Sequence, residues 1–394
     1  MKALTSTGWK GLNKHRSLKN KENTAMKNLL EDIEEVLLMG PGPNCVPPEV
    51  YTALSRKTLG YLDAHLMRIL EDLQGMLRKI MNTKNELTIT LSGTGSAGME
   101  AAFVNLVEPG GRVLILVNGF FGQRMQEVAA RLGAAVDVLE FPWGTPVDTK
   151  AVEKKVRQES YKIVGVIHAE TSTGVQNPVQ EIGALLKGSN TLYVVDAVTS
   201  LGGIEMRMDE WNIDVLYSCS QKCLGCPPGL SPLSFSERAM AAAAGRKNKV
   251  PNWYLDLTLI GNYWGKNHVY HHTTPSNMVY GLYQALLLLL DEGMEHVFSR
   301  YKENHLALVA GLEELNMKLL VEKPYRLPML NAVLVPEGID ELSVRRRLRN
   351  EFKIEIGGGL GLLAGKVWRI GLMGYTSRKE NVDRLLGALR QVLR

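Results

Sequence analysis

Short apolar runs alternate with helix-like stretches between residues 88 and 235, and this alternation restricts the fold more than any other feature of the chain. The helix-like stretches include residues 98–107 and 124–132. The apolar runs have the length and composition of buried strands: residues 88–91, 112–117, 163–167, 192–195, 215–217 and 231–235. Strands that alternate with helices predict an α/β fold with a mostly parallel central sheet and helices on both faces.

The character of the chain changes after residue 290. We expect a long helix over 297–315, short strands near 326–335 and 367–372, further helices near 342–352 and 378–393, and a glycine turn at 357–359. These elements predict two domains: a large α/β domain over residues 30–290, including the N-terminal segment, and a smaller C-terminal α+β domain over residues 291–394. We expect the N-terminal segment to pack on the small domain or on a partner chain.

The front of the chain is basic, since residues 1–27 carry seven Lys or Arg and one Glu. Such an end is typical of a solvated, disordered extension, which we assign to residues 1–29. It has no apolar segment of the kind found in secretory signals, so we expect a cytoplasmic protein, with a mitochondrial presequence as the alternative.

The remaining composition is that of an ordinary globular protein: 394 residues, 45% hydrophobic, 22% charged, with a net charge of +5. No basic patch with interleaved aromatic residues supports nucleic-acid binding. The most hydrophobic run, residues 286–290, is far too short to cross a bilayer, so we expect no membrane association.

Asp196 and Lys222 each follow a predicted strand. Ligands of open α/β sheets bind at the carboxyl ends of the strands, so both side chains should reach the same edge. An amine beside a carboxylate is what pyridoxal 5′-phosphate (PLP) requires, because the lysine binds the cofactor aldehyde and the carboxylate keeps the pyridine nitrogen protonated. An ordinary salt bridge is the alternative that these two residues alone would favour.

The segment 92–98, with the sequence SGTGSAG, follows a predicted strand and opens a helix. Its glycines allow a close backbone approach, and its hydroxyls and helix N-terminal amides can hold a phosphate. It lacks the lysine of a P-loop, and no acidic residue follows the second strand as in dinucleotide-binding folds. The phosphate of a compact cofactor is therefore expected, with a glycine-rich helix cap as the alternative.

Three further features fit the same cofactor, and each has a structural alternative. Phe121 can stack on a planar ring or pack in the core. The hydroxyls of residues 170–174 (ETSTG) can donate to the cofactor's phenolic oxygen or form a local turn. Arg369 can bind a carboxylate through two hydrogen bonds or lie exposed on an edge strand.

Two other patterns suggest metal sites only at first sight. Adjacent histidines such as His271 and His272 diverge on either regular element, so they are poor co-ligands and we expect no metal. The C-x-x-C pattern at 223–226 lacks the second pair that structural zinc needs. We interpret the cysteines around Lys222 as small, semi-buried residues in a reducing compartment.

Taken together, these motifs resemble the alanine–glyoxylate and serine–pyruvate aminotransferases, the class V aminotransferases of the fold-type-I PLP enzymes. The resemblance extends from about residue 37 to the C-terminus. The matching segments are 40–43 (GPGP), 92–95 (SGTG), 118–119 (NG) with 122–124 (GQR), 170–174 (ETSTG), 195–198 (VDAV), 220–222 (SQK), 263–265 (YWG), 270–273 (YHHT) and 368–371 (WRIG).

The resemblance implies the following roles. Lys222 forms the Schiff base and Asp196 is the partner of the pyridine nitrogen. The implied phosphate contacts are Thr94, Gly95, Ser96 and Gln221. Phe121 and Val198 are implied to pack on the two ring faces, and Thr171 to lie near the phenolic oxygen. Arg369 and Gly42 belong to the implied substrate site. The resemblance also implies a homodimer with shared active sites, in which Tyr270 and Thr273 reach the partner's cofactor phosphate.

One departure from the family pattern is Tyr61, which follows Gly60 where many relatives carry His, and it leaves the entrance loop and the substrate preference open. We expect a PLP-dependent aminotransferase that moves an amino group from alanine or serine to glyoxylate or pyruvate. Two alternatives stay open. One is a PLP lyase or desulfurase, for which Cys45 is a candidate thiol; the other is a catalytically silent PLP-fold binding protein.

Overall fold

The computed structural model describes residues 28–393. Nearly all of the extension expected over residues 1–29 lies outside the described residues. The described residues 28–35 belong to a unit separate from the rest of the chain and contain the 3₁₀ turn Leu29–Asp32, capped by the Asn28 side chain. The chain from Val36 onward forms one compact unit.

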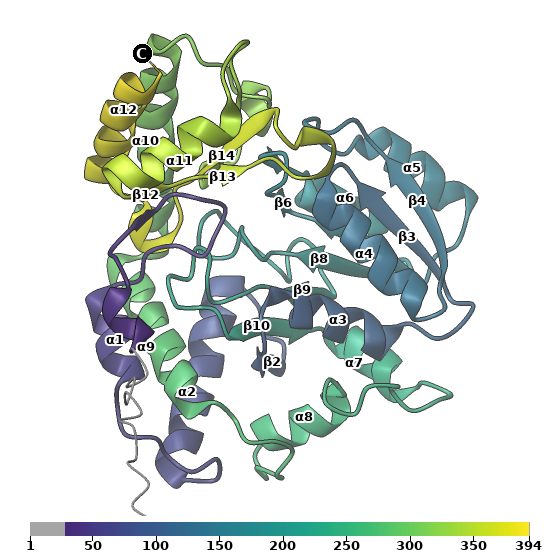
Figure 1. Ribbon diagram of the computed structural model, residues 1–394. Helices are drawn as coiled ribbons and strands as arrows, with labels where there is room; N and C mark the ends of the chain where they lie inside the picture. The colour runs from purple at the N-terminus through teal and green to yellow at the C-terminus, as the bar shows by residue number, and fades with distance from the viewer. Residues whose placement is uncertain (1–27, 394) are drawn as a thin grey trace, which may run out of the picture. The chain divides into compact units, whose positions relative to one another are not determined.

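A seven-stranded sheet forms the centre of this unit (Figure 1). Its spatial order is β2 (Leu87–Ser92), β10 (Leu230–Phe235), β9 (Val215–Tyr217), β8 (Leu192–Asp196), β5 (Ile163–Ile167), β3 (Arg112–Val117) and β4 (Ala135–Glu140). The neighbours from β9 to β4 are parallel, and β10 runs antiparallel to both β2 and β9. The mostly parallel sheet predicted from the sequence is confirmed, whereas strand β4 and the reversal of β10 were not foreseen.

Helices cover both faces of the sheet. Gly165 of β5 faces Phe103 of α3 (Gly95–Leu106) and Met125 of α4 (Phe120–Arg131), so these two helices share a face. Successive residues of a strand point to opposite faces, and Tyr193 pairs with Val164, so α6 (Val179–Leu186), which packs on the Tyr193 ring, covers the other face. The other elements here are α1 (Pro48–Leu54), α2 (Ala64–Met81), α5 (Thr149–Gln158), α7 (Glu237–Ala244), α8 (Leu257–Trp264), α9 (Ser276–Glu292), and the hairpin of β6 (Ala169–Glu170) and β7 (Val175–Gln176).

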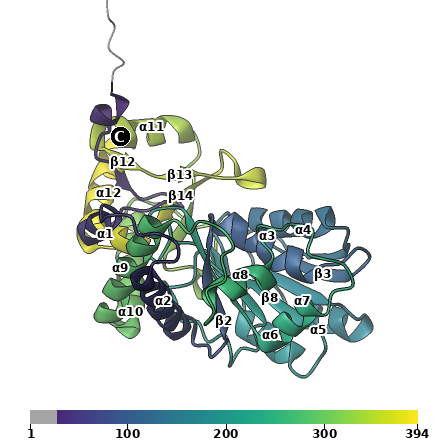
Figure 2. The same ribbon diagram turned by 90° about the horizontal axis from the view of Figure 1, so that it is seen from below.

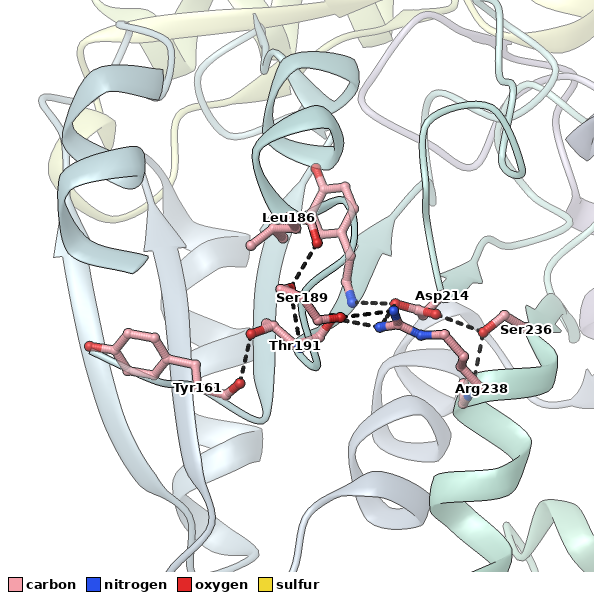
Figure 3. A network of polar contacts seen from close by, with 9 residues as sticks. Tyr161, Leu186, Ser189, Thr191, Asp214, Ser236 and Arg238 are labelled. Carbon is pink, nitrogen blue, oxygen red and sulfur yellow. Dashed lines mark hydrogen bonds and ion pairs between the residues drawn. The ribbon is translucent and has the colours of Figure 1, made fainter. Parts of the chain in front are cut away.

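A polar network at the amino ends of β8 and β9 holds the strands that carry the site (Figure 3). Asp214 accepts hydrogen bonds from the main-chain N–H of Tyr193 at 3.0 Å, the Ser236 hydroxyl at 2.8 Å and Arg238 at 3.2 Å. The guanidinium of Arg238 also donates to the Thr191 carbonyl at 2.8 Å. Because one buried carboxylate satisfies donors from β8 and from the start of α7, the strands are fixed at the end opposite their carboxyl termini.

The C-terminal elements lie together in both views and enclose a second hydrophobic core (Figure 1, Figure 2). Its elements are α10 (Met294–Glu314), β11 (Leu330–Leu334), α11 (Glu341–Phe352), β12 (Ile354–Glu355), β13 (Gly357–Gly358), β14 (Val367–Gly371), α12 (Lys379–Val392) and the 3₁₀ turns Lys323–Tyr325, Gly361–Leu363 and Gly374–Thr376. Leu37 and Met39 join this core, and β1 (Leu37–Leu38) pairs in parallel with β12. The domain limits at residues 290 and 291 stay a prediction.

The glycine turn expected at 357–359 is wrong for its first two residues. Gly357 and Gly358 form an edge strand, β13, that pairs with Arg369 and Trp368 of β14. Gly357 leaves room for the ring of Pro41, which a side chain at this position would displace. The glycine pair therefore allows a close approach to the strand instead of forming a bend. No helix among residues 28–393 is long and apolar enough to span a membrane.

Candidate active site

A cavity of about 170 Å³ lies at the carboxyl ends of the parallel strands and gathers most of the predicted site residues. Its lining includes Thr94, Gly95, Ser96, Phe121, Thr171, Asp196, Val198, Gln221 and Lys222. These residues follow the ends of separate strands, and parallel strands bring such positions to one edge of the sheet. The fold thus assembles in space what the sequence distributes over more than a hundred positions.

Asp196 is the last residue of β8 and is almost fully buried. Its Oδ1 accepts a hydrogen bond from the Val198 N–H at 2.8 Å, and the Tyr217 phenol faces the same carboxyl outside hydrogen-bond geometry. Burial raises the pKa of Asp196 to about 7, against the Val198 hydrogen bond, and the nearby Glu170 raises it further. A positive partner such as a protonated pyridine nitrogen would restore the ionised form.

Lys222 lies in the turn that follows β9, and its Nζ donates to the carbonyl of Pro41. Burial lowers the pKa of Lys222, and the charge of Arg369 acts in the same direction. A lowered pKa enriches the neutral amine, which is the form that attacks a carbonyl. Gly42 has φ +103°, and a Cβ there would lie 2.5 Å from the lysine nitrogen, so glycine is required beside Lys222.

The opposite end of the cavity suits a phosphate. Thr94 is the N-cap residue of α3, and its side chain forms no capping hydrogen bond. A Cβ on Gly95 would lie 2.8 Å from Val198, so glycine permits this close packing. The Oε1 atom of Gln221 is buried without a hydrogen-bond partner, and a half-turn of the amide would offer a donor instead. An uncapped helix N-terminus beside an unpaired buried amide fits the phosphate of PLP.

Arg369 of β14 does not line the cavity itself but contacts Thr171, which does. Its Nε donates to the Gly358 carbonyl at 2.6 Å, and its Nη1 donates to the Thr171 carbonyl at 3.5 Å. Burial lowers the pKa of Arg369 to about 10. A buried guanidinium that donates to two neutral carbonyls is suited to a carboxylate ligand. The exposed edge-strand alternative is wrong, because Arg369 is only 7% exposed and β14 is the central strand of its sheet.

Tyr270 and Thr273 do not join this cavity within one chain. Tyr270 is 53% exposed, and its ring centroid lies 4.7 Å from that of Tyr61. Thr273 lines a separate surface pocket together with Gly60 and Tyr61. Their predicted role at a partner's phosphate stays a prediction.

Glu170 is a site residue that the sequence reasoning missed. Its Oε2 accepts hydrogen bonds from the N–H groups of Phe121 and Gly122 at 3.1 and 3.2 Å, and its Oε1 accepts from the N–H and hydroxyl of Ser172 at 3.0 and 2.6 Å. The carboxylate therefore holds the first turn of α4, which carries Phe121 into the cavity. The sequence signal that could have identified Glu170 is the position of an acidic residue between an apolar strand and a hydroxyl-rich turn.

Arg124 also lines the cavity and was not predicted as a site residue. It lies one turn after Phe121 on α4, and its guanidinium carbon is 5.0 Å from the centroid of the Phe121 ring. A cation at this distance from an aromatic face is attracted to it, which helps to fix the ring.

Residues 49–385 match the family model described as aminotransferase class-V, and the chain belongs to this family. Class-V aminotransferases depend on PLP, which is the cofactor that the cavity residues fit. The structure of alanine–glyoxylate aminotransferase from Nostoc sp. superimposes with a TM-score of 0.92 at 46% identity and covers 96% of this chain and 100% of that chain.

Curated relatives give the same result. Alanine–glyoxylate aminotransferase of Oryctolagus cuniculus is 39% identical over 361 residues, which is 91% of this chain and 92% of the relative. (S)-Ureidoglycine–glyoxylate transaminase of Bacillus subtilis (strain 168) is 37% identical over 374 residues, which is 90% of each chain. The chain is thus similar along nearly its whole length to aminotransferases whose names include glyoxylate.

We predict that Glu170→Gln weakens PLP binding about tenfold or more, because the amide nitrogen would face N–H or O–H donors where the carboxylate accepted four hydrogen bonds, an effect of about 1–3 kcal/mol. Quenching of tryptophan fluorescence on titrating the apoenzyme with PLP measures the dissociation constant. Glu127→Gln, at an exposed carboxylate of α4, the helix that Glu170 holds, is the matched control. Equal dissociation constants for the two variants would contradict the role of Glu170.

Proposed function

We propose that this class-V aminotransferase transfers the amino group of a small amino acid, alanine or serine, to a small 2-oxo acid, glyoxylate or pyruvate. One observation carries the proposal: a lysine amine and an acid for a pyridine nitrogen line one small cavity, and a buried arginine contacts the Thr171 carbonyl of its lining. The names of the relatives, which pair glyoxylate with alanine or with ureidoglycine, support small substrates.

Each residue of this group has a distinct task. PLP, when bound, supplies the electron sink for the charge left on the substrate after loss of its α-proton. Lys222 would anchor the cofactor until the substrate amine displaces it. In the first half-reaction the free lysine would take the proton from the α-carbon of the amino donor, and in the second it would give a proton to the α-carbon of the acceptor. Asp196 keeps the pyridine nitrogen protonated, and Arg369 orients the substrate through its α-carboxylate.

A second arginine at the cavity does not change the expected substrate class. The charge of Arg124 acts on the phenol of Tyr217, which faces Asp196. Arg124 therefore belongs to the Asp196 end, whereas Arg369 bonds to Thr171 at the rim. Since one arginine at the rim serves one carboxylate, substrates with a distal carboxylate should be poor.

The cysteines give no support to the desulfurase alternative. Burial raises the pKa of Cys219 and Cys226 to about 12 and that of Cys223 to about 11. Cys45 lies outside the cavity lining, where its Sγ donates to the Val36 carbonyl and accepts from the Leu38 N–H. A desulfurase needs a reactive thiolate near the cofactor, and high thiol pKa values oppose one.

We also propose that the enzyme is a homodimer with shared sites. The exposed large apolar side chains include Tyr270 itself, the adjacent Val269, and three residues whose rings contact residues 270–272: Tyr61, Trp253 and Tyr254. Exposed apolar and aromatic residues of this kind mark contact surfaces, and a second copy would place Tyr270 and Thr273 where the sequence pattern expects them. The expected cytoplasmic location stays a prediction.

The donor preference tests the proposed reaction. With glyoxylate or pyruvate as acceptor, we predict that alanine, serine or ureidoglycine exceeds aspartate and glutamate in kcat/KM. Arg369→Lys should lower kcat/KM for alanine and serine by a similar factor, about 2–4 kcal/mol in the transition state, because lysine lacks the two-pronged geometry. Aspartate or glutamate as the best donor, or unchanged alanine turnover in Arg369→Lys, would exclude the proposed substrate class.

Asp196→Asn should separate stability from activity. The pKa of Asp196 is raised from 3.8 to about 7, so the unfolded chain loses this proton first and the apo fold loses stability as pH rises from about 4 to about 7. The cost is on the order of 4 kcal/mol at 1.36 kcal/mol per pKa unit. The apo variant should therefore melt higher than apo wild type at pH 8, less so at pH 5.

The same variant should lose about 10²–10³-fold in kcat, the effect of removing one preorganised charge. Differential scanning fluorimetry of the apo forms and single-turnover proton abstraction measure the two effects. Lower apo stability at pH 8, or proton abstraction within a few-fold of wild type, would refute the role of Asp196.

Subunit mixing tests the shared sites. Lys222→Ala and the double variant Tyr270→Ala/Thr273→Ala should each be inactive, and a heterodimer of the two should have one intact site out of two. We predict that denaturation and co-refolding recover about a quarter of wild-type activity, since half of the dimers are mixed and each has one active site. Native mass spectrometry confirms exchange. Confirmed heterodimers without activity would mean that each site is built from one chain.

A further inference from the structure

His271 and His272 form one continuous chain of hydrogen bonds that ends at Ser92. Ser92 opens the glycine-rich segment 92–98, which we call the phosphate loop. His272 Nε2 lies 2.9 Å from the hydroxyl of Ser92, and His272 Nδ1 lies 2.8 Å from His271 Nδ1. His271 Nε2 lies 3.2 Å from the carbonyl oxygen of Trp253. Both imidazoles thus use both ring nitrogens, which explains why they are adjacent without being metal ligands.

The chain determines where each proton lies. The carbonyl of Trp253 can only accept, so His271 carries its proton on Nε2 and its Nδ1 accepts. His272 must then donate from Nδ1, which leaves its Nε2 as the acceptor of the Ser92 hydroxyl proton. Only this set of neutral tautomers satisfies all three contacts, and the Ser92 hydroxyl has a fixed direction as a result.

Neutral aromatic groups surround the chain. The Trp253 ring stacks on His271 with centroids 4.3 Å apart, and the Tyr254 ring lies 5.1 Å from His272. Tyr263 of α8 faces His272 at 6.2 Å. Tyr254, Tyr263 and the other histidine are titratable groups that face these imidazoles. Burial lowers the pKa of His272, and the neighbouring His271 lowers it further, which favours the neutral form of His272.

Ser92 links the chain to the segment 92–98. It is the last residue of β2 and directly precedes the glycine-rich turn that leads into α3. The Tyr254 hydroxyl also donates to the Ser92 carbonyl at 3.3 Å, and the Tyr254 ring packs against His272, so Tyr254 contacts both partners of this hydrogen bond.

We propose that His271 and His272 are positioning residues whose neutral hydrogen-bond chain fixes the segment 270–273 on the phosphate loop. The chain thereby couples the cofactor site of one subunit to the donors that the same segment presents to its partner. The cross-subunit part rests on the shared sites proposed above. The anchoring of the loop stands on the contacts within one chain.

PLP dissociation at pH 8 tests the proposal without using activity. Apoenzyme is titrated with PLP for wild type, His272→Gln and His272→Phe, with tryptophan fluorescence as the signal. Glutamine can accept from Ser92 and donate to His271, whereas phenylalanine keeps a ring without hydrogen bonds. His296→Gln, on an exposed histidine of α10, controls for the loss of a histidine elsewhere.

We expect His272→Gln to bind PLP within about threefold of wild type. His272→Phe should bind at least tenfold more weakly, and His296→Gln should follow wild type. Binding by His272→Gln as weak as that of His272→Phe would overturn the proposal, as would wild-type affinity in His272→Phe.

The outcomes separate this proposal from the shared sites. If subunit mixing fails but His272→Phe still weakens binding, the shared sites are wrong and the chain anchors only its own loop. If mixing succeeds and His272→Phe binds normally, the positioning role is wrong. Apo melting temperatures show whether His272→Phe is folded. If it is not, the dissociation constant of His272→Gln for PLP decides whether the proposal stands.

Discussion

The site depends on one buried carboxyl group, Glu170, which accepts four hydrogen bonds from the chain itself while burial raises its pKa. When ionised, it opposes ionisation of Asp196 and stabilises the charge of Arg369, so it influences both ends of the cavity. Burial also shifts the pKa of Asp196, Lys222 and Arg369 toward the neutral form. A cofactor and a substrate with complementary charges would reverse these shifts, so the ligands complete an electrostatic arrangement that the apo protein leaves unbalanced.

Glycines make this concentration of charge sterically feasible. Gly42 lets the chain pass against the Lys222 side chain, and Gly95 lets the start of α3 approach Val198. On the same helix Gly98 packs against Tyr217, the residue that faces Asp196. Since a single methyl group at any of the three would displace a site residue, the glycines act on the catalytic geometry as well as on the turns.

Sequence patterns predicted the sheet and the cavity because strand ends carry local signals: an apolar run followed by a polar residue. Lys222, Asp196 and the segment 92–98 were found in this way. Glu170 and the His271–His272 chain were missed in their actual roles, since both depend on which donors the fold brings near. Glu170 bonds to residues 48 to 49 positions earlier, and His272 bonds to a serine 180 positions earlier. Alternation along the chain also could not show that β10 is reversed or that Gly357 and Gly358 extend a sheet.

The phosphate end of the cavity offers a bound anion few charged groups within one chain. Among the described residues, the lining at this end consists of a helix N-terminus, hydroxyls and the amide of Gln221. The two basic residues of the cavity lining, Lys222 and Arg124, serve other parts of the site. Dipoles and neutral donors bind a dianion less strongly than a countercharge does, so additional hydroxyl donors from a second copy would add affinity. Such donors help only if they are held in place, since ordering a mobile segment on binding would offset their contribution. The segment 270–273, anchored through His272 to Ser92 at the start of the phosphate loop, would meet this requirement.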